Sequence, residues 1–203
     1  MIRLYSGTPG SGKSLHVAER IYNRLNAGKP VVCNFAINEK WLAKKPKRQK
    51  NFTCIYNDEL SVNKLVNLSQ QYFDGRTVKE DSILLVIDEA QLLFNARTWD
   101  AKGRDAWTKF FTQHRKFGFE IILVAQFDRM LDRQIRSLIE YECVHRKLLN
   151  YGWKGILLSC LMLSPRLFVA VNVWYPMKEK TGAEFFKYKK RYSKLYDTHY
   201  IFG

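Results

Sequence analysis

Gly7-Thr8-Pro9-Gly10-Ser11-Gly12-Lys13-Ser14 is the stretch that decides the fold of this 203-residue chain. It fits the pattern G-x-x-x-x-G-K-[ST] at every position, which is the pattern of a phosphate-binding loop (P-loop). The apolar run Ile2–Ser6 precedes it and predicts a strand, and apolar residues at helical spacing follow it over Lys13–Asn26. A strand, a glycine-rich loop and a helix in this order predict main-chain N–H groups and a helix N-terminus that point at a phosphate.

The residue types within this motif predict its ligands. Lys13 would reach the β- and γ-phosphates of a nucleotide, and the Ser14 hydroxyl would be a ligand of magnesium. All eight loop residues are expected to line the phosphate site, namely Gly7, Thr8, Pro9, Gly10, Ser11, Gly12, Lys13 and Ser14. ATP and Mg²⁺ are the expected ligands, and no base-reading motif separates ATP from GTP.

A second feature is Ile83–Ile87, five aliphatic residues that are followed by Asp88 and Glu89. Such a run predicts a central parallel strand that is buried on both faces. Carboxylates at the carboxyl end of such a strand lie beside the ligand crevice of an α/β sheet. Asp88 would hold Mg²⁺ through water, and Glu89 would be the general base for an attacking water. The alternative for Glu89 is a solvated acid or a charge at the start of a helix.

Two further side-chain types are expected at a hydrolytic site. Gln126 follows the predicted strand Phe119–Ala125, where it could sense the γ-phosphate or could simply bind a loop. Phosphoryl transfer also favours a cation at the developing charge, from the same chain or from a neighbouring subunit. Arg115 is assigned this role, with Arg133 and Arg136 as alternatives that the sequence does not separate, and a surface ion pair is the other interpretation of each.

Alternating strands and helices predict the α/β class, as a P-loop NTPase with a three-layer sandwich and a mainly parallel central sheet of the additional-strand, RecA-like type. We expect a single domain over residues 1–203, with the nucleotide-binding core in 1–150 and a short β-rich extension in 151–203 packed on it. Further helices are predicted at Asn57–Gln71, Gly103–Phe117 and Asp128–Glu140, further strands at Val31–Phe35, Phe52–Tyr56, Glu142–Leu148 and Leu167–Tyr175, and a loop at Glu39–Asn51. No element is assigned in the tail Lys178–Gly203.

The charge of the chain is strongly positive. Thirty-four Lys and Arg against nineteen Asp and Glu give a net charge of +15, which favours polyanionic partners. Two basic clusters are interleaved with aromatic residues, one over Lys40–Lys50 and one over Lys187–Lys194. Each could bind single-stranded nucleic acid or an anionic membrane surface, or could be a solvated face whose aromatic residues belong to the core.

Apolar residues also gather at Gly155–Leu163. This run is about half of the ~20 residues that span a bilayer, so no transmembrane helix is expected. Core packing is the favoured role, with a membrane-facing or coat-contacting patch as the alternative. The widely spaced cysteines have no metal-site spacing and predict reduced thiols in a cytoplasmic protein.

With these motifs placed, the chain resembles the zonula occludens toxin (Zot) family, which includes the assembly ATPases of filamentous phages. The P-loop is shared with many unrelated proteins, so other segments carry the resemblance. They are Val86-Ile87-Asp88-Glu89-Ala90-Gln91, Phe94-Asn95-Ala96-Arg97-Thr98-Trp99, His114 through Ile122, Asp128 through Ser137, His145-Arg146 and Tyr196-Asp197-Thr198.

The resemblance implies an ATPase of virion assembly and export, at the cytoplasmic face of the host inner membrane. The implied partners are phage coat proteins and a membrane export complex, with single-stranded phage DNA, the anionic membrane surface and further copies of the chain as additional ones. Family members usually continue into a transmembrane helix and an outer segment, and the toxin activity associated with that outer part is not carried over.

Three other functions remain open from the sequence. The chain could be a nucleic-acid translocating or packaging ATPase without a role in export, or a small-molecule P-loop kinase. It could also be a scaffold that binds nucleotide and hydrolyses little.

Overall fold

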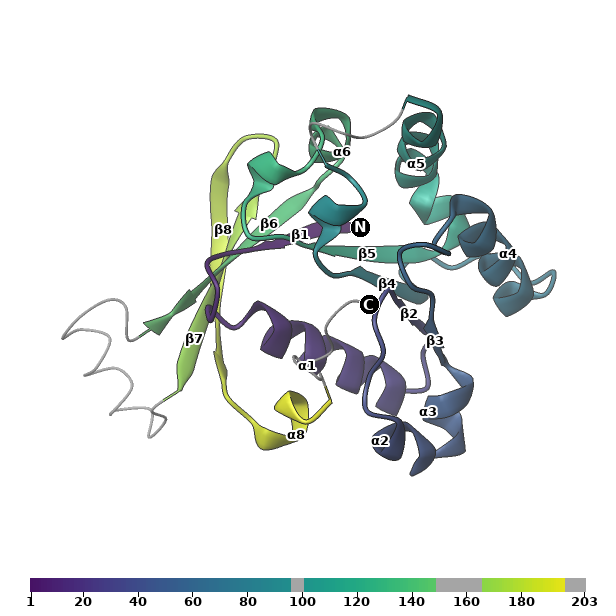
Figure 1. Cartoon of the computed structure of the whole chain (residues 1–203), viewed down its shortest axis with the longest axis horizontal. Coiled ribbons are helices and arrows are strands. Elements are labelled where there is room, and N and C mark those ends of the chain that lie inside the picture. The colour runs from purple at the N-terminus through teal and green to yellow at the C-terminus, as the bar shows by residue number, and fades with distance from the viewer. Residues whose placement is uncertain (96–100, 149–165, 196–203) are drawn as a thin grey trace.

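A computed structural model describes residues 1–95, 101–148 and 166–195 of the chain, without the side chains of residues 101 and 102 (Figure 1). The parts of the resemblance at Arg97-Thr98-Trp99 and Tyr196-Asp197-Thr198, and the apolar run Gly155–Leu163, lie outside the described residues.

One eight-stranded sheet organises the molecule, in the order β3-β2-β4-β5-β1-β6-β7-β8. The strands are β1 Ile2–Ser6, β2 Val31–Cys33, β3 Phe52–Cys54, β4 Ile83–Ile87, β5 Phe119–Val124, β6 Tyr141–Lys147, β7 Leu167–Trp174 and β8 Glu179–Lys187. The first six pair in parallel, and β7 and β8 continue the sheet as antiparallel strands. The predicted α/β class with a mainly parallel sheet is confirmed.

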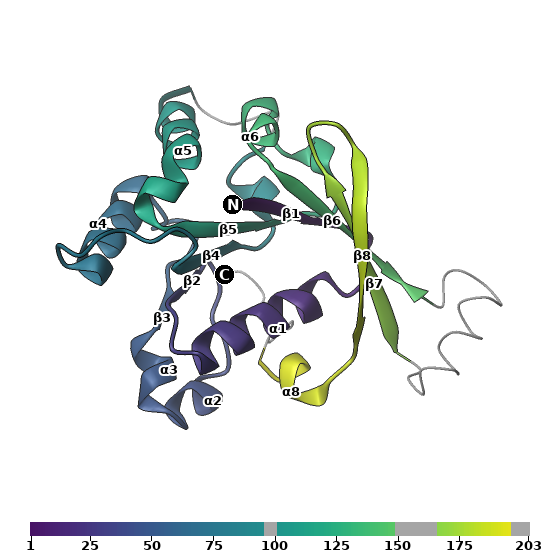
Figure 2. The same cartoon turned by 180° about the vertical axis from the view of Figure 1, so that it is seen from behind.

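Helices cover both faces of this sheet (Figures 1 and 2). On one face lie α1 Lys13–Asn26, α2 Glu39–Ala43, α3 Pro46–Lys50 and α8 Lys190–Ser193, and on the other lie α4 Val62–Phe73, α5 Ala101–Gln113 and α6 Arg133–Ser137. The alternation of side chains along each strand separates two apolar cores. Leu4 of β1 belongs to the core beneath α4 and α5, whereas Tyr5 belongs to the core beneath α1.

The strands at the centre of the sheet are those with continuous apolar runs. Every residue of β4 and of β5 is buried, because helices pack on both of their faces. The core order β4-β5-β1 brings the carboxyl ends of three strands together, and these are followed by Asp88, Gln126 and Gly7. The sheet therefore places the three sequence motifs at one edge.

The structure corrects three local predictions. The expected loop Glu39–Asn51 contains α2 and α3, because the Asn38 side chain accepts the Trp41 N–H at 2.9 Å and Pro46 opens the next helix. The helix predicted from Asn57 begins only at Val62, where Ser61 is its N-cap.

The third correction concerns the helix predicted over Asp128–Glu140. It is broken into a 3₁₀ turn at Asp128–Met130 and the short α6. Leu131 between them is extended and forms a β-bridge with Asn95, and the Asp132 carboxylate accepts the Gln134 N–H to start α6. The tail without an assignment contains β8 and α8, because β8 pairs along its whole length with β7.

Candidate nucleotide-binding site

The loop Gly7–Ser14 joins β1 to α1 and has the backbone of a phosphate cradle. Gly7 has φ 138°, and a Cβ placed there would lie 2.5 Å from the carbonyl oxygen of His145. Gly12 has φ 97°, and its Cβ would lie 2.7 Å from the Phe168 ring. Only glycine tolerates both restrictions. The Gly7 N–H donates to the carbonyl of Gln126 at 3.1 Å, which ties the loop to the end of β5.

Lys13 lies over this loop, and its Nζ donates to the carbonyls of Gly7 at 2.5 Å and Thr8 at 3.2 Å. Burial lowers the pKa of the Lys13 ammonium, and the carboxylates of Glu89 and Asp88 partly offset this effect. The strand order β4-β5-β1 places the loop that carries Lys13 and the acidic strand end Asp88-Glu89 at one edge of the sheet.

Asp88 and Glu89 differ in their surroundings although they are adjacent. Asp88 is buried, and burial raises its pKa to about 6, while the Glu89 N–H that donates to its Oδ1 at 2.9 Å acts in the opposite direction. Glu89 is half-buried and has a left-handed backbone with φ 47°. The Gln91 amide donates to its carboxylate. With this left-handed backbone Glu89 follows the end of β4 and precedes the 3₁₀ turn Ala90–Leu92.

Asn34 is a site residue that the sequence analysis missed. It follows β2, the neighbour of β4, and is completely buried. Its side-chain Oδ1 accepts the Asp88 N–H at 2.7 Å, and its Nδ2 donates to the Asp88 carbonyl at 2.9 Å. Nδ2 also donates to Asn57 Oδ1 at 2.8 Å. The sequence analysis placed Asn34 inside the predicted strand Val31–Phe35, whereas β2 ends at Cys33, so only the structure puts Asn34 at a strand end as Gln126 is.

Gln126 lies at the end of β5, and with Gly7 and Thr8 it lines a cavity of about 420 Å³. Arg146, at the carboxyl-terminal part of β6, lines the same cavity. The sequence analysis used Arg146 only as part of the family resemblance. The structure thus brings one arginine beside the phosphate loop that was absent from the predicted site.

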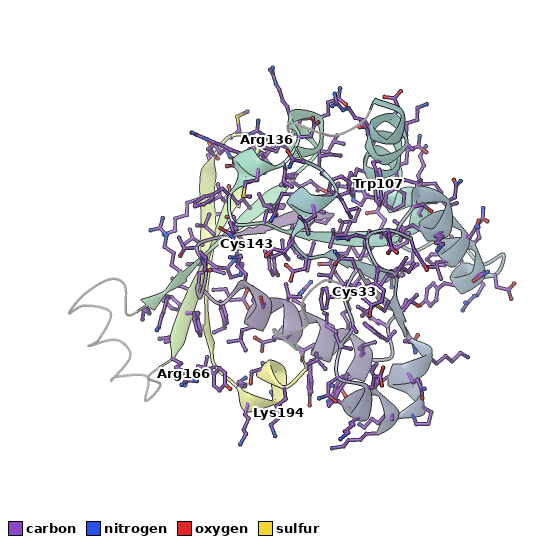
Figure 3. All side chains as sticks on the ribbon, in the orientation of Figure 1. Cys33, Trp107, Arg136, Cys143, Arg166 and Lys194 are labelled. Carbon is purple, nitrogen blue, oxygen red and sulfur yellow. The ribbon has the colours of Figure 1, made fainter. Side chains whose placement is uncertain are left out.

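Arg115 is not brought to the site of its own chain. It precedes β5, whereas Gln126 follows it, so the length of the strand separates them by roughly 20 Å. Its guanidinium donates to Glu140 Oε2 at 2.6 Å, at the amino-terminal edge of the sheet. This is the surface ion pair that was the alternative interpretation. Arg133 and Arg136 belong to α6, and Figure 3 labels Arg136 beside that helix.

The residues present fit a divalent cation that is shared with phosphate oxygens. Asp88 is a buried carboxylate whose pKa is raised by burial, so a cation beside it would favour its ionised form. Ser14 is half-buried in the first turn of α1. One carboxylate and one hydroxyl suit Mg²⁺, which takes few protein ligands and keeps waters and phosphate oxygens.

Comparison with known proteins identifies the family of this chain and finds solved structures with a similar fold. The sequence model described as "Zonular occludens toxin (Zot)" matches residues 1–199. The Gene 1 protein of Enterobacteria phage M13 is 26% identical over 207 residues, which cover 98% of this chain and 59% of that protein. The chain therefore spans about three fifths of the length of this curated relative.

Two solved structures have a fold similar to that of this chain. The N-terminal domain of zonular occludens toxin from Neisseria meningitidis has a TM-score of 0.57 at 18% identity, over 97% of this chain and 98% of that one. The genome packaging NTPase B204 from Sulfolobus turreted icosahedral virus 2, in complex with ATP-gammaS, has a TM-score of 0.53 at 14% identity, over 92% and 96%. These likenesses show that the chain shares the α/β fold of these proteins.

In the described part of the chain, no helix has the length and apolar character needed to cross a bilayer.

Proposed function

Because this chain belongs to the zonular occludens toxin (Zot) family, we propose that it is an ATPase that couples ATP hydrolysis to the assembly and export of phage particles. The observation that carries the hydrolytic part is the convergence of Lys13, Asp88 and Glu89 at the carboxyl edge of the sheet. The phage part is supported by distant relatives, the Gene 1 proteins of phages such as M13.

Each residue of the site has a distinct chemical task in this proposal. The loop N–H groups and Lys13 bind the phosphates and orient the γ-phosphoryl group. Ser14 and Asp88 would hold Mg²⁺, which when bound neutralises phosphate charge. Glu89 accepts a proton from the attacking water, and Gln126 positions that water. Arg146 lies on the cavity beside Gly7 and Thr8 and is the proposed catalytic cation of the same chain, whereas a role for Arg115 requires a neighbouring subunit.

Asn34 fixes the position of the acidic strand end during this reaction. Its amide holds both main-chain polar groups of Asp88, so the two carboxylates that follow β4 keep a constant distance from the P-loop. Proton abstraction and metal binding both depend on such positioning, because small displacements reduce the rate strongly.

The hydrolytic assignment is tested with Glu89→Gln. We expect this variant to bind a fluorescent ATP analogue as well as the wild type does, and to lose at least about a hundredfold in kcat, a loss within the range that general-base catalysis contributes. The amide keeps the size of the side chain and its partner Gln91 but cannot accept the proton. Unchanged turnover would remove Glu89 from the mechanism.

The role in assembly has a separate test in the host. A phage carrying Glu89→Gln in this protein is expected to replicate its DNA normally and to release few particles. Coat proteins and a membrane export complex are the proposed partners, and release of particles at the wild-type level would contradict the coupling to export. A fall in DNA replication instead would favour a nucleic-acid motor.

A further inference from the structure

The two basic clusters of the sequence meet on one face of the molecule. The α2–α3 segment contributes five exposed lysines, and the segment of α8 contributes three lysines and one arginine. They are Lys40, Lys44, Lys45, Lys47 and Lys50, together with Lys189, Lys190, Arg191 and Lys194. We call the surface made by these nine residues the α2–α3–α8 face.

Direct contacts fix these segments together although about 150 residues separate them in the sequence. The Asn38 N–H donates to the carbonyl of Leu195 at 3.1 Å, and the Asn38 Nδ2 donates to that of Lys194 at 3.2 Å. The ring of Tyr22 in α1 lies 5.2 Å from both Trp41 and Tyr192, so α1 joins the two segments. Figures 1 and 2 both show α2, α3 and α8 along the lower edge of the molecule, beneath α1.

The charges of this face are nearly uniform and directed outward. Glu39 is the only acidic residue within residues 39–50 and 189–194. The one arginine of the α2–α3 segment, Arg48, is buried and binds Asn26 and the Trp41 carbonyl, so it serves the fold. Figure 3 labels Lys194 at the lower edge, below α8. A surface of this kind attracts a polyanion.

Most of the aromatic residues that interleave with these lysines pack in the core or point away from this face. Tyr192 is buried, and Trp41 and Phe52 pack against the core beneath α1. Phe185 is exposed, but its neighbour Phe186 points to the α1 side of the sheet, so Phe185 points to the other side. Tyr188 is exposed, and the Arg166 guanidinium lies 5.0 Å from the centroid of its ring. Among the described residues of this face Tyr188 is therefore the one exposed ring, and stacking of successive bases of a single strand uses several such rings.

The basic residues of this face are almost all lysines, which suits binding to a surface that carries many negative charges. Eight of the nine are lysines, which are compact, strongly hydrated point charges. The exception, Arg191, donates to the Tyr192 hydroxyl at 2.8 Å and lies over the Tyr22 ring, so its fork is engaged within the protein. Bidentate recognition of a base or a phosphate favours the planar fork of arginine, which lysine lacks. Clustered basic charge near a bilayer binds anionic lipid headgroups.

We propose that the α2–α3–α8 face docks this protein on the surface of an anionic phospholipid bilayer. The face lies on the α1 side of the sheet, whereas the cavity beside the P-loop is lined from the carboxyl ends of β1, β5 and β6. Docking would leave that cavity, α4, α5 and α6 accessible. The inference does not depend on hydrolysis, since it concerns a different surface.

The test measures sedimentation of the nucleotide-free protein with vesicles of phosphatidylglycerol and phosphatidylcholine. We expect binding to these vesicles that weakens with salt, and no binding to pure phosphatidylcholine. The variant Lys44→Glu/Lys190→Glu/Lys194→Glu should bind at least about tenfold more weakly. The matched control Lys79→Glu/Lys109→Glu/Lys116→Glu makes the same charge change with exposed lysines beyond this face and should bind like the wild type.

Thermal melting of both variants checks that each one is folded, and their ATPase rates are measured without lipid. Equal loss in both variants would mean that only net charge matters and would overturn the proposal, as would wild-type protein that ignores anionic vesicles. Loss of DNA binding in the first variant with vesicle binding retained would assign the face to nucleic acid. A failure of hydrolysis alone would leave the vesicle result standing.

Discussion

The side-chain amide of Asn34 makes hydrogen bonds to both main-chain polar groups of Asp88, at 2.7 Å to its N–H and 2.9 Å to its carbonyl. The main-chain pairing of β2 with β4 ends at Cys33 and Val86. The side chain of Asn34 extends the contact between the two strands beyond these residues. The acidic end of β4, formed by Asp88 and Glu89, is therefore held in place by a side chain of the neighbouring strand as well as by β4 itself.

Asn34→Ala is therefore expected to affect both stability and turnover. Two buried main-chain groups lose their partners, which costs about 2–4 kcal/mol of unfolding free energy. The kcat should fall at least about tenfold, because Asp88 and Glu89 lose their fixed position. Urea denaturation and steady-state ATPase assays measure the two effects. The control Asn57→Ala removes only the third contact of the Asn34 amide and should cost about 1 kcal/mol or less.

Arg146 and Arg115 form a matched pair of exposed arginines for testing the catalytic cation. Arg146 lines the cavity beside Gly7 and Thr8, whereas Arg115 pairs with Glu140 at the opposite edge of the sheet. Arg146→Ala should lower kcat at least about tenfold, since it removes positive charge near the phosphate loop. Arg115→Ala should keep kcat within about twofold in the isolated protein. The reverse result, with activity that depends on protein concentration, would assign Arg115 to the site of a neighbouring subunit.

The buried pair His16 and His145 predicts a fall in stability at acidic pH. His145 Nδ1 lies 3.2 Å from the Ser6 carbonyl oxygen, which can only accept, so Nδ1 carries the proton and donates it. The Nε2 atom of His145 then accepts a hydrogen bond from His16 Nδ1 at 2.9 Å. Burial lowers the pKa of His16 to about 3 and that of His145 to about 4. Both rings are therefore neutral in the folded protein at pH values where the unfolded chain is protonated.

The sign of the effect follows from linkage. Below the unfolded pKa of about 6.5 the unfolded state binds more protons, so stability falls as the pH drops from about 6.5 towards 4. Two such groups give a slope of up to about 2.7 kcal/mol per pH unit. In His145→Gln the slope should be about half as steep, measured by urea denaturation between pH 7 and pH 5. An unchanged slope would mean that other groups cause the acid sensitivity.

The sequence by itself determined the parts of the protein that are local in the chain. Eight consecutive residues specify the phosphate loop, because glycines at fixed positions and a following helix are sufficient for its conformation. The apolar runs at Ile83–Ile87 and Phe119–Val124 specify buried parallel strands, and residues after parallel strands share one edge of a sheet. The position of Asp88, Glu89 and Gln126 at that edge was therefore predictable, whereas their chemical roles stay predictions.

The rest depended on the tertiary structure, because it requires contacts between distant segments. Asn34 and Arg146 reach the site only through the strand order β2-β4-β5-β1-β6, which no local pattern encodes. The sequence did not distinguish Arg115 from Arg133 and Arg136 as the catalytic cation. In the structure the length of β5 separates Arg115 from the P-loop. The two basic clusters became one surface only when α1, which contacts both α3 and α8, placed the two segments on one face. Local sequence fixes backbone conformation and burial, whereas the pairing of strands and the packing of helices decide which polar side chains meet.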